Sequence, residues 1–228
     1  MNGIHLEQAG VVLQGRTLLQ PMTLHLSERR IAILGRNGAG KTTFLRLLAG
    51  LQPPTTGTVK VEGADPADRR AMLGAIGILF QSPDHQIIFP TVEEELGFGL
   101  RQMNHPDPAG AVRALLQAEG RADWAERPVQ SLSQGQKQYL CLMAVLLMAP
   151  KTILLDEPFA ALDLPTRMAL QRRLAALPQR LVTITHDPAS VHGADRVLWL
   201  EEGRIVADGP PDAVLPPFLV EMERLGRE

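Results

Sequence analysis

The sequence of 228 residues has little cysteine and little net charge, and each shortage excludes a class of protein. Its single cysteine, Cys141, cannot build a disulfide framework and suits a reducing compartment such as the cytoplasm. Cys141 lies in an apolar stretch, which favours inert packing over reactivity. The net charge of −2 at pH 7 disfavours nucleic-acid binding through a broad basic surface.

Long hydrophobic runs are also absent. The most hydrophobic run, from Leu140 to Pro150, has about eleven residues, whereas a membrane-spanning helix needs about 20. We therefore expect this run to form a buried helix. The first ten residues include His5 and Glu7 and lack the apolar segment of a signal peptide. A membrane pathway, if one is involved, must then be supplied by other polypeptides.

What the sequence does contain is a glycine-rich loop that matches G-x-x-x-x-G-K-[ST] without a mismatch. The apolar run 31–34 predicts a buried strand before the loop, and residues 43–48 predict a helix that ends at Gly50. Backbone N–H groups, the helix dipole and the Lys41 ammonium attract phosphate oxygens, and the Thr42 hydroxyl can bind Mg²⁺. The predicted phosphate-binding residues are Gly35, Arg36, Asn37, Gly38, Ala39, Gly40, Lys41, Thr42 and Thr43.

A second apolar strand, residues 152–155, ends in two carboxylates, Asp156 and Glu157. A continuous apolar strand is typical of a parallel sheet covered on both faces. Asp156 can hold Mg²⁺ directly or through water, and Glu157 can act as the general base, a role typically worth about 10²–10⁴ in rate. A solvated acidic turn is the alternative. The glycine-rich loop makes a phosphate site the better interpretation.

The run LSQGQ, Leu132 to Gln136, completes a set of motifs whose order resembles that of the ATP-binding cassette (ABC) ATPases over nearly the whole chain. In this family the signature lies at a helix N-terminus and closes over the γ-phosphate of ATP held by the partner subunit. The resemblance implies that Ser133, Gly135 and Gln136 contact that ATP, through the Ser133 hydroxyl, the close approach that Gly135 allows and the helix dipole. Gln134 stands where the family more often has glycine.

Three further residues match family motifs. Gln81 matches the Q-loop glutamine, which is implied to sense Mg²⁺ and the attacking water and to connect the site to the transporter. Asp163, in the D-loop sequence Ala161-Leu162-Asp163, is implied to reach across the dimer, and His186 to contact the γ-phosphate. The resemblance thus implies Glu157, His186 and Gln81 as catalytic residues and Thr42, Gln81 and Asp156 as Mg²⁺ ligands.

One family feature is missing. An aromatic side chain that stacks on adenine usually lies some twenty-odd residues before the glycine-rich loop, but residues 11–15 contain none. We expect Leu13 or Gln14 to take its place, with an apolar or amide contact instead of ring stacking.

The expected fold is α/β, a P-loop NTPase of the ABC nucleotide-binding type with a mainly parallel core sheet, an N-terminal antiparallel β subdomain and an inserted α-helical subdomain. We predict one ABC ATPase domain, 1–228. Its parts are a nucleotide-binding core with the antiparallel portion (1–82 and 150–210), a helical subdomain with the signature (83–149) and a short C-terminal tail (211–228). A helix from Pro165 to Pro178 and a short charged final helix are also expected.

The segment after Gln81 resembles that of energy-coupling-factor (ECF) importer ATPases, through the sequence 80–86, FQSPDHQ, and the later TVEEELGFG, 91–99. In such importers this groove receives a coupling helix with basic residues from a membrane scaffold. Asp84, Glu93, Glu94 and Glu95 offer an acidic rim for it. A solvated helix N-terminus, where acids favour the dipole, explains each glutamate equally well. His85 is expected at the surface.

The resemblance implies ATP hydrolysis, with Mg²⁺, at two composite sites of a homodimer or of a dimer with a closely related ATPase subunit. It further implies integral-membrane scaffold (T) and substrate-binding (S) subunits and a peripheral position on the cytoplasmic face of the cell membrane. The implied cargo is a vitamin, with biotin favoured, or cobalt or nickel. The alternative is a non-transport or other ABC ATPase that acts in complex assembly or lipoprotein release.

Overall fold

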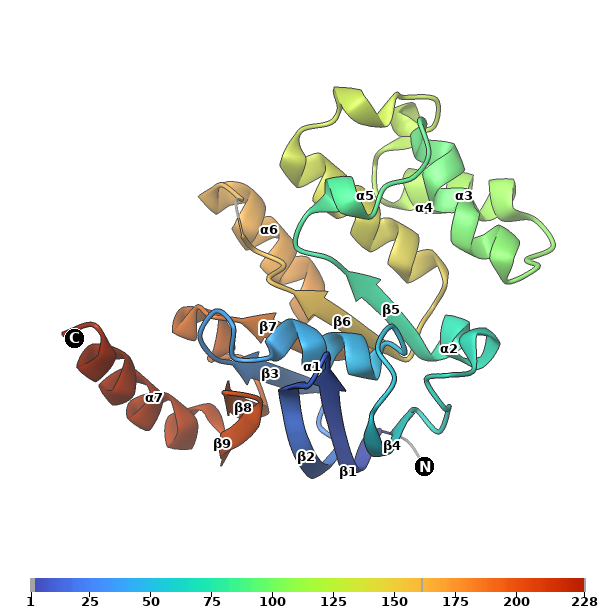
Figure 1. Ribbon diagram of the computed structural model, residues 1–228. Helices are drawn as coiled ribbons and strands as arrows, with labels where there is room; N and C mark the ends of the chain where they lie inside the picture. Colours follow the sequence, from blue (N-terminus) through green and yellow to red (C-terminus); the bar gives the residue numbers. More distant parts are fainter. Residues whose placement is uncertain (1–2, 161, 228) are drawn as a thin grey trace.

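The computed structural model describes residues 3–160 and 162–227, so Ala161 of the predicted D-loop and the first two and the last residues of the predicted domain lie outside it. Two sheets and a separate group of helices make up the molecule (Figure 1). The strands and helices are β1 (Ile4–Leu13), β2 (Arg16–Leu26), β3 (Arg30–Leu34), α1 (Lys41–Leu48), β4 (Thr56–Val61), α2 (Arg69–Ala75), β5 (Ile76–Leu79), α3 (Val92–Gln102), α4 (Pro108–Ala118), α5 (Gln134–Leu147), β6 (Thr152–Asp156), α6 (Leu164–Ala175), β7 (Arg180–Thr185), β8 (Arg196–Glu201), β9 (Arg204–Gly209) and α7 (Pro211–Leu225).

The core sheet has the strand order β5-β6-β7-β3-β8-β9, in which every neighbouring pair except β8–β9 is parallel. The other sheet is antiparallel, with the order β2-β1-β4. Helix α1 packs between the two sheets, and its Phe44 and Leu47 are fully buried among the apolar side chains of both. The expected α/β fold with a mainly parallel core sheet and an antiparallel β portion is confirmed.

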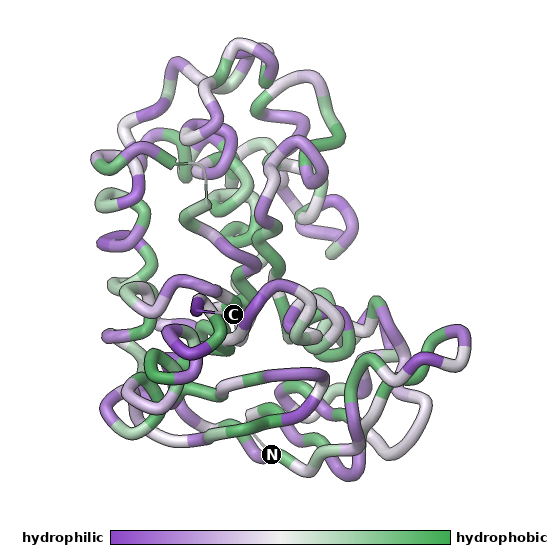
Figure 2. The backbone as a smooth tube through the Cα atoms, turned by 60° about the vertical axis from the view of Figure 1, so that its left-hand side comes forward, coloured by the Kyte–Doolittle hydropathy of each residue, from purple (hydrophilic) through white to green (hydrophobic). Residues whose placement is uncertain are grey.

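The helices α3 and α4 and one face of α5 form a group at one end of the molecule, where Figure 1 shows these helices in green and yellow. They share an apolar cluster of their own, which includes Val112, Trp124 and Leu140. The opposite face of α5 instead packs on the core sheet through Cys141 and Val145. In Figure 2 the interior of this junction is largely apolar and the outer loops of the helical group are largely hydrophilic. The inserted helical part is thus confirmed, while the exact subdomain boundaries stay a prediction.

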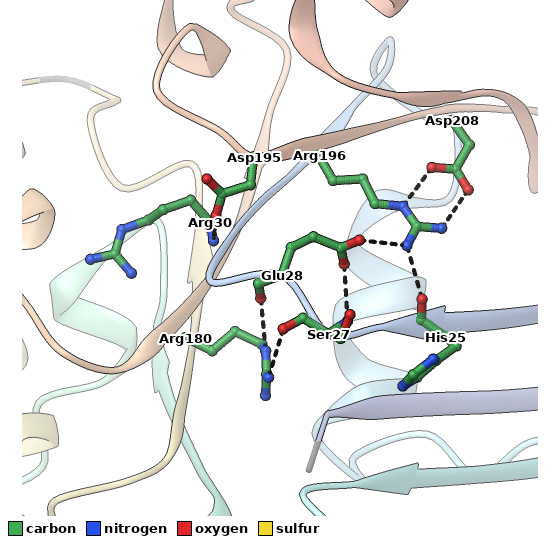
Figure 3. Close-up of polar contacts among 8 residues, drawn as sticks. All are labelled: His25, Ser27, Glu28, Arg30, Arg180, Asp195, Arg196 and Asp208. Carbon is green, nitrogen blue, oxygen red and sulfur yellow. Dashed lines mark hydrogen bonds and ion pairs between the residues drawn. The ribbon is translucent and has the colours of Figure 1, made fainter. Parts of the chain in front are cut away.

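Polar contacts join the antiparallel sheet to the core sheet (Figure 3). From β8, Arg196 donates through Nε to Asp208 Oδ1 on β9 at 2.6 Å and through Nη1 to the carbonyl of His25 on β2 at 2.9 Å. The same Nη1 lies 3.0 Å from Glu28 Oε1, just after β2. Burial would raise the pKa of Glu28, but hydrogen bonds from backbone N–H groups and from Arg196 lower it, so the carboxylate stays charged. Arg196 therefore ties β2, β8 and β9 together.

Two helix predictions need correction. Helix α6 ends at Ala175 and not just before Pro178 as predicted. Leu177 therefore lies beyond the helix, although it packs in the same apolar cluster as Leu170 and Leu174. The final helix, α7, is not short, because it runs for 15 residues with Pro216 and Pro217 inside it. Each internal proline removes a helical hydrogen bond, and the burial of Phe218 against Trp199, with ring centroids 5.5 Å apart, offsets that cost.

Within the described ranges, no helix combines the length and the hydrophobicity that crossing a bilayer requires.

Candidate active site

A cavity of about 570 Å³ opens at the carboxyl ends of the core strands. This is where ligands of open parallel sheets usually bind. It gathers ten of the predicted site residues from segments far apart in the sequence: Asn37, Gly38, Gly40, Lys41, Thr42, Thr43, Gln81, Asp156, Glu157 and His186. Gly35, Arg36, Ala39, Ser133, Gly135, Gln136 and Asp163 are not among the residues that line it.

The glycine-rich loop follows β3 and ends in α1, as the sequence predicts. Gly38 and Gly40 have φ angles of 82° and 104°, a region that favours glycine. Gly35 has a different role, because a Cβ atom there would lie 2.2 Å from the carbonyl oxygen of Leu200. Gly35 therefore allows the loop to pack against β8 and does not line the cavity.

Lys41 is held within the loop. Its Nζ donates to the carbonyls of Gly35 and Arg36 at 2.8 and 2.9 Å, and only 7% of the residue is exposed. Burial lowers the pKa of Lys41, and the carboxylates of Glu157 and Asp156 oppose that shift. Because the two carbonyls fix the side chain, its ammonium is already oriented in the cavity before a phosphate binds.

Arg36 and Ala39 support the loop from outside the cavity. The Arg36 guanidinium points to the β8–β9 hairpin, where its Nη2 lies 2.8 Å from Glu201 Oε1. The Ala39 carbonyl accepts from Gly203 N at 2.9 Å, and Ala39 is buried. The side chains of Arg36 and Ala39 thus hold the loop in place, and the predicted contact of these two residues with phosphate falls to their backbone N–H groups.

The second phosphate motif places two carboxylates at the end of β6. Burial, reinforced by the charge of Glu157, raises the pKa of Asp156, and Lys41 opposes the rise. Glu157 has a φ of 48°, a left-handed conformation that is uncommon outside glycine, and its N–H donates to the carbonyl of Ile184 at 2.9 Å. This conformation turns the Glu157 carboxylate toward His186, whose Nδ1 lies 2.7 Å from Glu157 Oε1.

His186 follows β7 and its side chain is 56% exposed, whereas that of Glu157 is 13% exposed. The exposed imidazole of His186 can therefore orient the shielded carboxylate of Glu157, and both residues line the cavity. The pair can therefore accept a proton from a water molecule and stabilise the charge that develops on a reacting group in the cavity.

The signature residues surround the N-terminus of α5. Ser133 caps the helix, since its Oγ accepts from Gln136 N at 3.3 Å while Gln136 Oε1 accepts from Ser133 N at 2.9 Å. The hydroxyl proton of Ser133 remains available to an outside acceptor. A Cβ on Gly135 would lie 2.5 Å from Thr166 Cγ2, so this glycine permits close packing against the start of α6.

Signature residues Ser133, Gly135 and Gln136 line another cavity, of about 650 Å³, between α5 and α6. Asp163 caps α6, with Oδ1 accepting from Thr166 N at 3.0 Å, and these hydrogen bonds lower its pKa. The chain therefore keeps its signature residues and Asp163 apart from its own glycine-rich loop.

Five residues that line the cavity were not predicted from the sequence: Arg16, Thr17 and Leu18 of β2, and Glu202 and Gly203 of the β8–β9 turn. The expected base contacts, Leu13 and Gln14, do not line the cavity. Leu13 ends β1 and pairs with Arg16, and Gln14 lies in the turn of the β1–β2 hairpin, so it is the strand after the turn that lines the site. No periodic or motif signal in the sequence marks these positions.

The segment after Gln81 departs from the expected acidic rim. Asp84, His85 and Glu94 are exposed, but Glu95 is only 7% exposed and its Oε2 accepts from the backbone N–H groups of Ile88 and Phe89, each at 2.9 Å. Glu95 thus holds the segment to α3 and does not belong to a rim. Glu94 lies in the first turn of α3, where Thr91 caps the helix, as the helix-dipole alternative predicts.

Comparison with known proteins agrees with this geometry. The family model described as "ABC transporter" matches residues 19–160. The biotin transport ATP-binding protein BioM of Rhodobacter capsulatus is 51% identical over 230 residues, which cover 100% of this chain and 98% of that protein. The energy-coupling factor transporter ATP-binding protein EcfA1 of Levilactobacillus brevis is 37% identical over 88% of this chain and 75% of its own length.

Among solved structures, cbiO1 from Clostridium perfringens, described as part of the ABC transporter complex cbiONQ, superposes with a TM-score of 0.81. The two share 27% identity, and the alignment covers 99% of this chain and 96% of that one.

Proposed function

Since the chain belongs to the ABC transporter family, we propose that it is the ATP-hydrolysing subunit of an ECF-type importer that drives the uptake of biotin through separate membrane subunits. The observation that carries the proposal is the full-length similarity to a biotin transport ATP-binding protein. The EcfA1 relative and the matching sequence after Gln81 support the importer type.

Each nucleotide site is composite in this proposal. ATP lies on the glycine-rich loop of one chain, and the Ser133 hydroxyl and the α5 N-terminus of a second chain reach its γ-phosphate. The separation of Ser133, Gly135, Gln136 and Asp163 from the chain's own cavity supports this arrangement. ATP then favours the closed dimer, and hydrolysis releases it.

Hydrolysis uses the pair at the ends of β6 and β7. Glu157 accepts the proton of the attacking water, and His186 orients the Glu157 carboxylate and contacts the γ-phosphate. Lys41 attracts the phosphate oxygens with its ammonium. Gln81 lies at the edge of the same cavity, where it can contact the attacking water.

The residues present fit a magnesium ion. Within the described part of the chain, no three His, Cys, Asp or Glu side chains cluster as metal ligands. The cavity does combine a hydroxyl, an amide and a carboxylate oxygen, from Thr42, Gln81 and Asp156. Magnesium prefers few protein oxygen ligands together with water and substrate phosphates. When bound, it would neutralise charge on the phosphates.

The proposed partners are a second copy of this chain or a closely related ATPase subunit, together with integral-membrane scaffold and substrate-binding subunits. The ATPase then sits on the cytoplasmic face of the membrane, where ATP is available. The exposed carboxylate of Glu94 offers complementary charge to a basic helix of the scaffold, whereas that of Asp84 is already paired with Lys137 of the same chain.

Uptake measurements on the assembled complex test the proposal. Cells that express the chain with its membrane subunits should accumulate labelled biotin, and the Glu157→Gln variant should abolish that uptake. Labelled cobalt and nickel serve as rival cargoes. Metal uptake that depends on Glu157, with biotin uptake unaffected, would contradict the biotin assignment.

A further inference from the structure

One face of α5 joins the signature motif to the segment around Gln81. Three side chains on this face, spaced at i, i+3 and i+4, reach that segment. Gln134 Nε2 donates to Asp84 Oδ2 at 2.8 Å, Lys137 Nζ donates to Asp84 Oδ1 at 2.6 Å, and Gln138 Nε2 donates to the carbonyl of Phe80 at 3.2 Å. These contacts bracket Gln81, because Phe80 precedes it and Asp84 follows it by three residues.

The segment itself is closed by a second set of bonds. Gln86 Oε1 accepts from Phe80 N and Gln86 Nε2 donates to the carbonyl of Ile78, each at 3.1 Å. Gln138 is only 3% exposed, so its bond to Phe80 is shielded from water. The segment around Gln81 therefore has a fixed conformation, and its contacts can hold α5 in one position.

Asp84 differs from the other contacts because its side chain is 47% exposed and both of its oxygens are occupied. Hydrogen bonds from Gln134 and then from Lys137 lower the pKa of Asp84, so its carboxylate stays charged near neutral pH. A charged acceptor strengthens the bond from the neutral Gln134 amide.

Gln134 is the first residue of α5, between Ser133 and Gly135. A glycine at this position, which is more usual in this kind of motif, has no side chain to reach Asp84. We propose that Gln134 is a positioning residue, whose bond to Asp84 fixes the first turn of α5 so that Ser133 and Gly135 meet the ATP of the partner subunit. The inference rests on the composite site proposed above.

The test uses the full chain in the Glu157→Gln background and measures the ATP concentration at which half of the chain is dimeric. Gln134→Ala and Asp84→Ala should each raise this concentration by about threefold to tenfold, as expected for one charge-assisted hydrogen bond. The double variant should be no worse than Asp84→Ala alone, because both changes break the same bond. Asp84→Asn keeps an oxygen acceptor and should have a milder effect than Asp84→Ala.

Three controls separate positioning from a general structural effect. ATP binding to the dilute monomer should be unchanged in every variant, because the glycine-rich loop is untouched, and thermal melting should confirm folding. Gln117→Ala, at an exposed glutamine of α4, should behave as the parent. Additive effects of Gln134→Ala and Asp84→Ala, or no effect of Gln134→Ala, would overturn the inference. A parent that never dimerises with ATP would instead overturn the composite site, and the inference with it.

Discussion

Glu157 Oε1 lies 2.7 Å from His186 Nδ1, so the carboxylate at the end of β6 and the imidazole after β7 act as one unit. Their strands are neighbours in the core sheet. The left-handed backbone of Glu157 directs its carboxylate to this contact.

Glu157→Gln removes the proton acceptor but keeps the size and one oxygen of the side chain. We expect ATP binding to be retained, turnover to fall by about 10²–10⁴, and the ATP-bound dimer to accumulate. Phosphate release and size-exclusion chromatography measure these two effects. Glu223→Gln, a change on the outer part of α7, is the matched control. Near-normal hydrolysis by Glu157→Gln would show that another group is the base.

His186→Ala should also reduce turnover, because the Glu157 carboxylate loses its orienting partner. The decisive comparison is the double variant with Glu157→Gln, whose loss of rate should be smaller than the product of the two single losses, because the orienting role of His186 is already lost and only its γ-phosphate contact remains. Steady-state rates at saturating ATP provide the measurement. If the two losses multiplied, the residues would act independently and the paired account would be wrong.

Lys41→Ala should weaken nucleotide binding by about 10- to 100-fold, the usual worth of a charge-assisted hydrogen bond in a shielded site. Equilibrium titration with a fluorescent ATP analogue measures the loss. The variant also frees the carbonyls of Gly35 and Arg36, so its melting temperature should be recorded alongside. Unchanged affinity in a folded variant would remove Lys41 from the phosphate site.

Cys141 should resist thiol reagents in the folded protein. Burial raises the pKa of its thiol to about 12, so below that pH the group stays protonated and the reactive thiolate is scarce. At pH 8 we expect no labelling within hours, and rapid labelling once denaturant exposes the thiol. Labelling should increase only as the pH approaches 12. Fast modification of the native chain at pH 8 would contradict the buried placement.

Site residues that belong to a local motif could be predicted from the sequence. Lys41, Asp156 and Glu157 follow strands that can be recognised from their apolar runs. Because parallel strands bring their carboxyl ends to one edge of a sheet, the sequence predicts that these three residues lie close together. The order of motifs likewise places the signature at the N-terminus of a helix, where the structure has α5, but the capping of that helix by Ser133 was not predicted.

Contacts that a residue makes with a distant segment of the chain could not be predicted from the sequence. Glu95 is predicted as one of the four acids of a surface rim, yet it is buried because the segment after Gln81 folds back onto α3. The bond between Gln134 and Asp84 joins residues 50 apart, and no pattern within either segment predicts it. The length of α7 depends on the burial of Phe218 against Trp199. The prolines in this segment predict a short helix instead.

In the composite site one chain's signature acts on the ATP of another chain, and mixing two inactive variants shows whether it does. Lys41→Ala and Ser133→Ala variants are prepared separately, each with low hydrolysis, and then combined at equal concentration. We expect hydrolysis to recover well above that of either variant alone, because a mixed dimer holds one site with both Lys41 and Ser133 intact. A mixture no more active than its components, although mixed dimers form, would contradict the composite site.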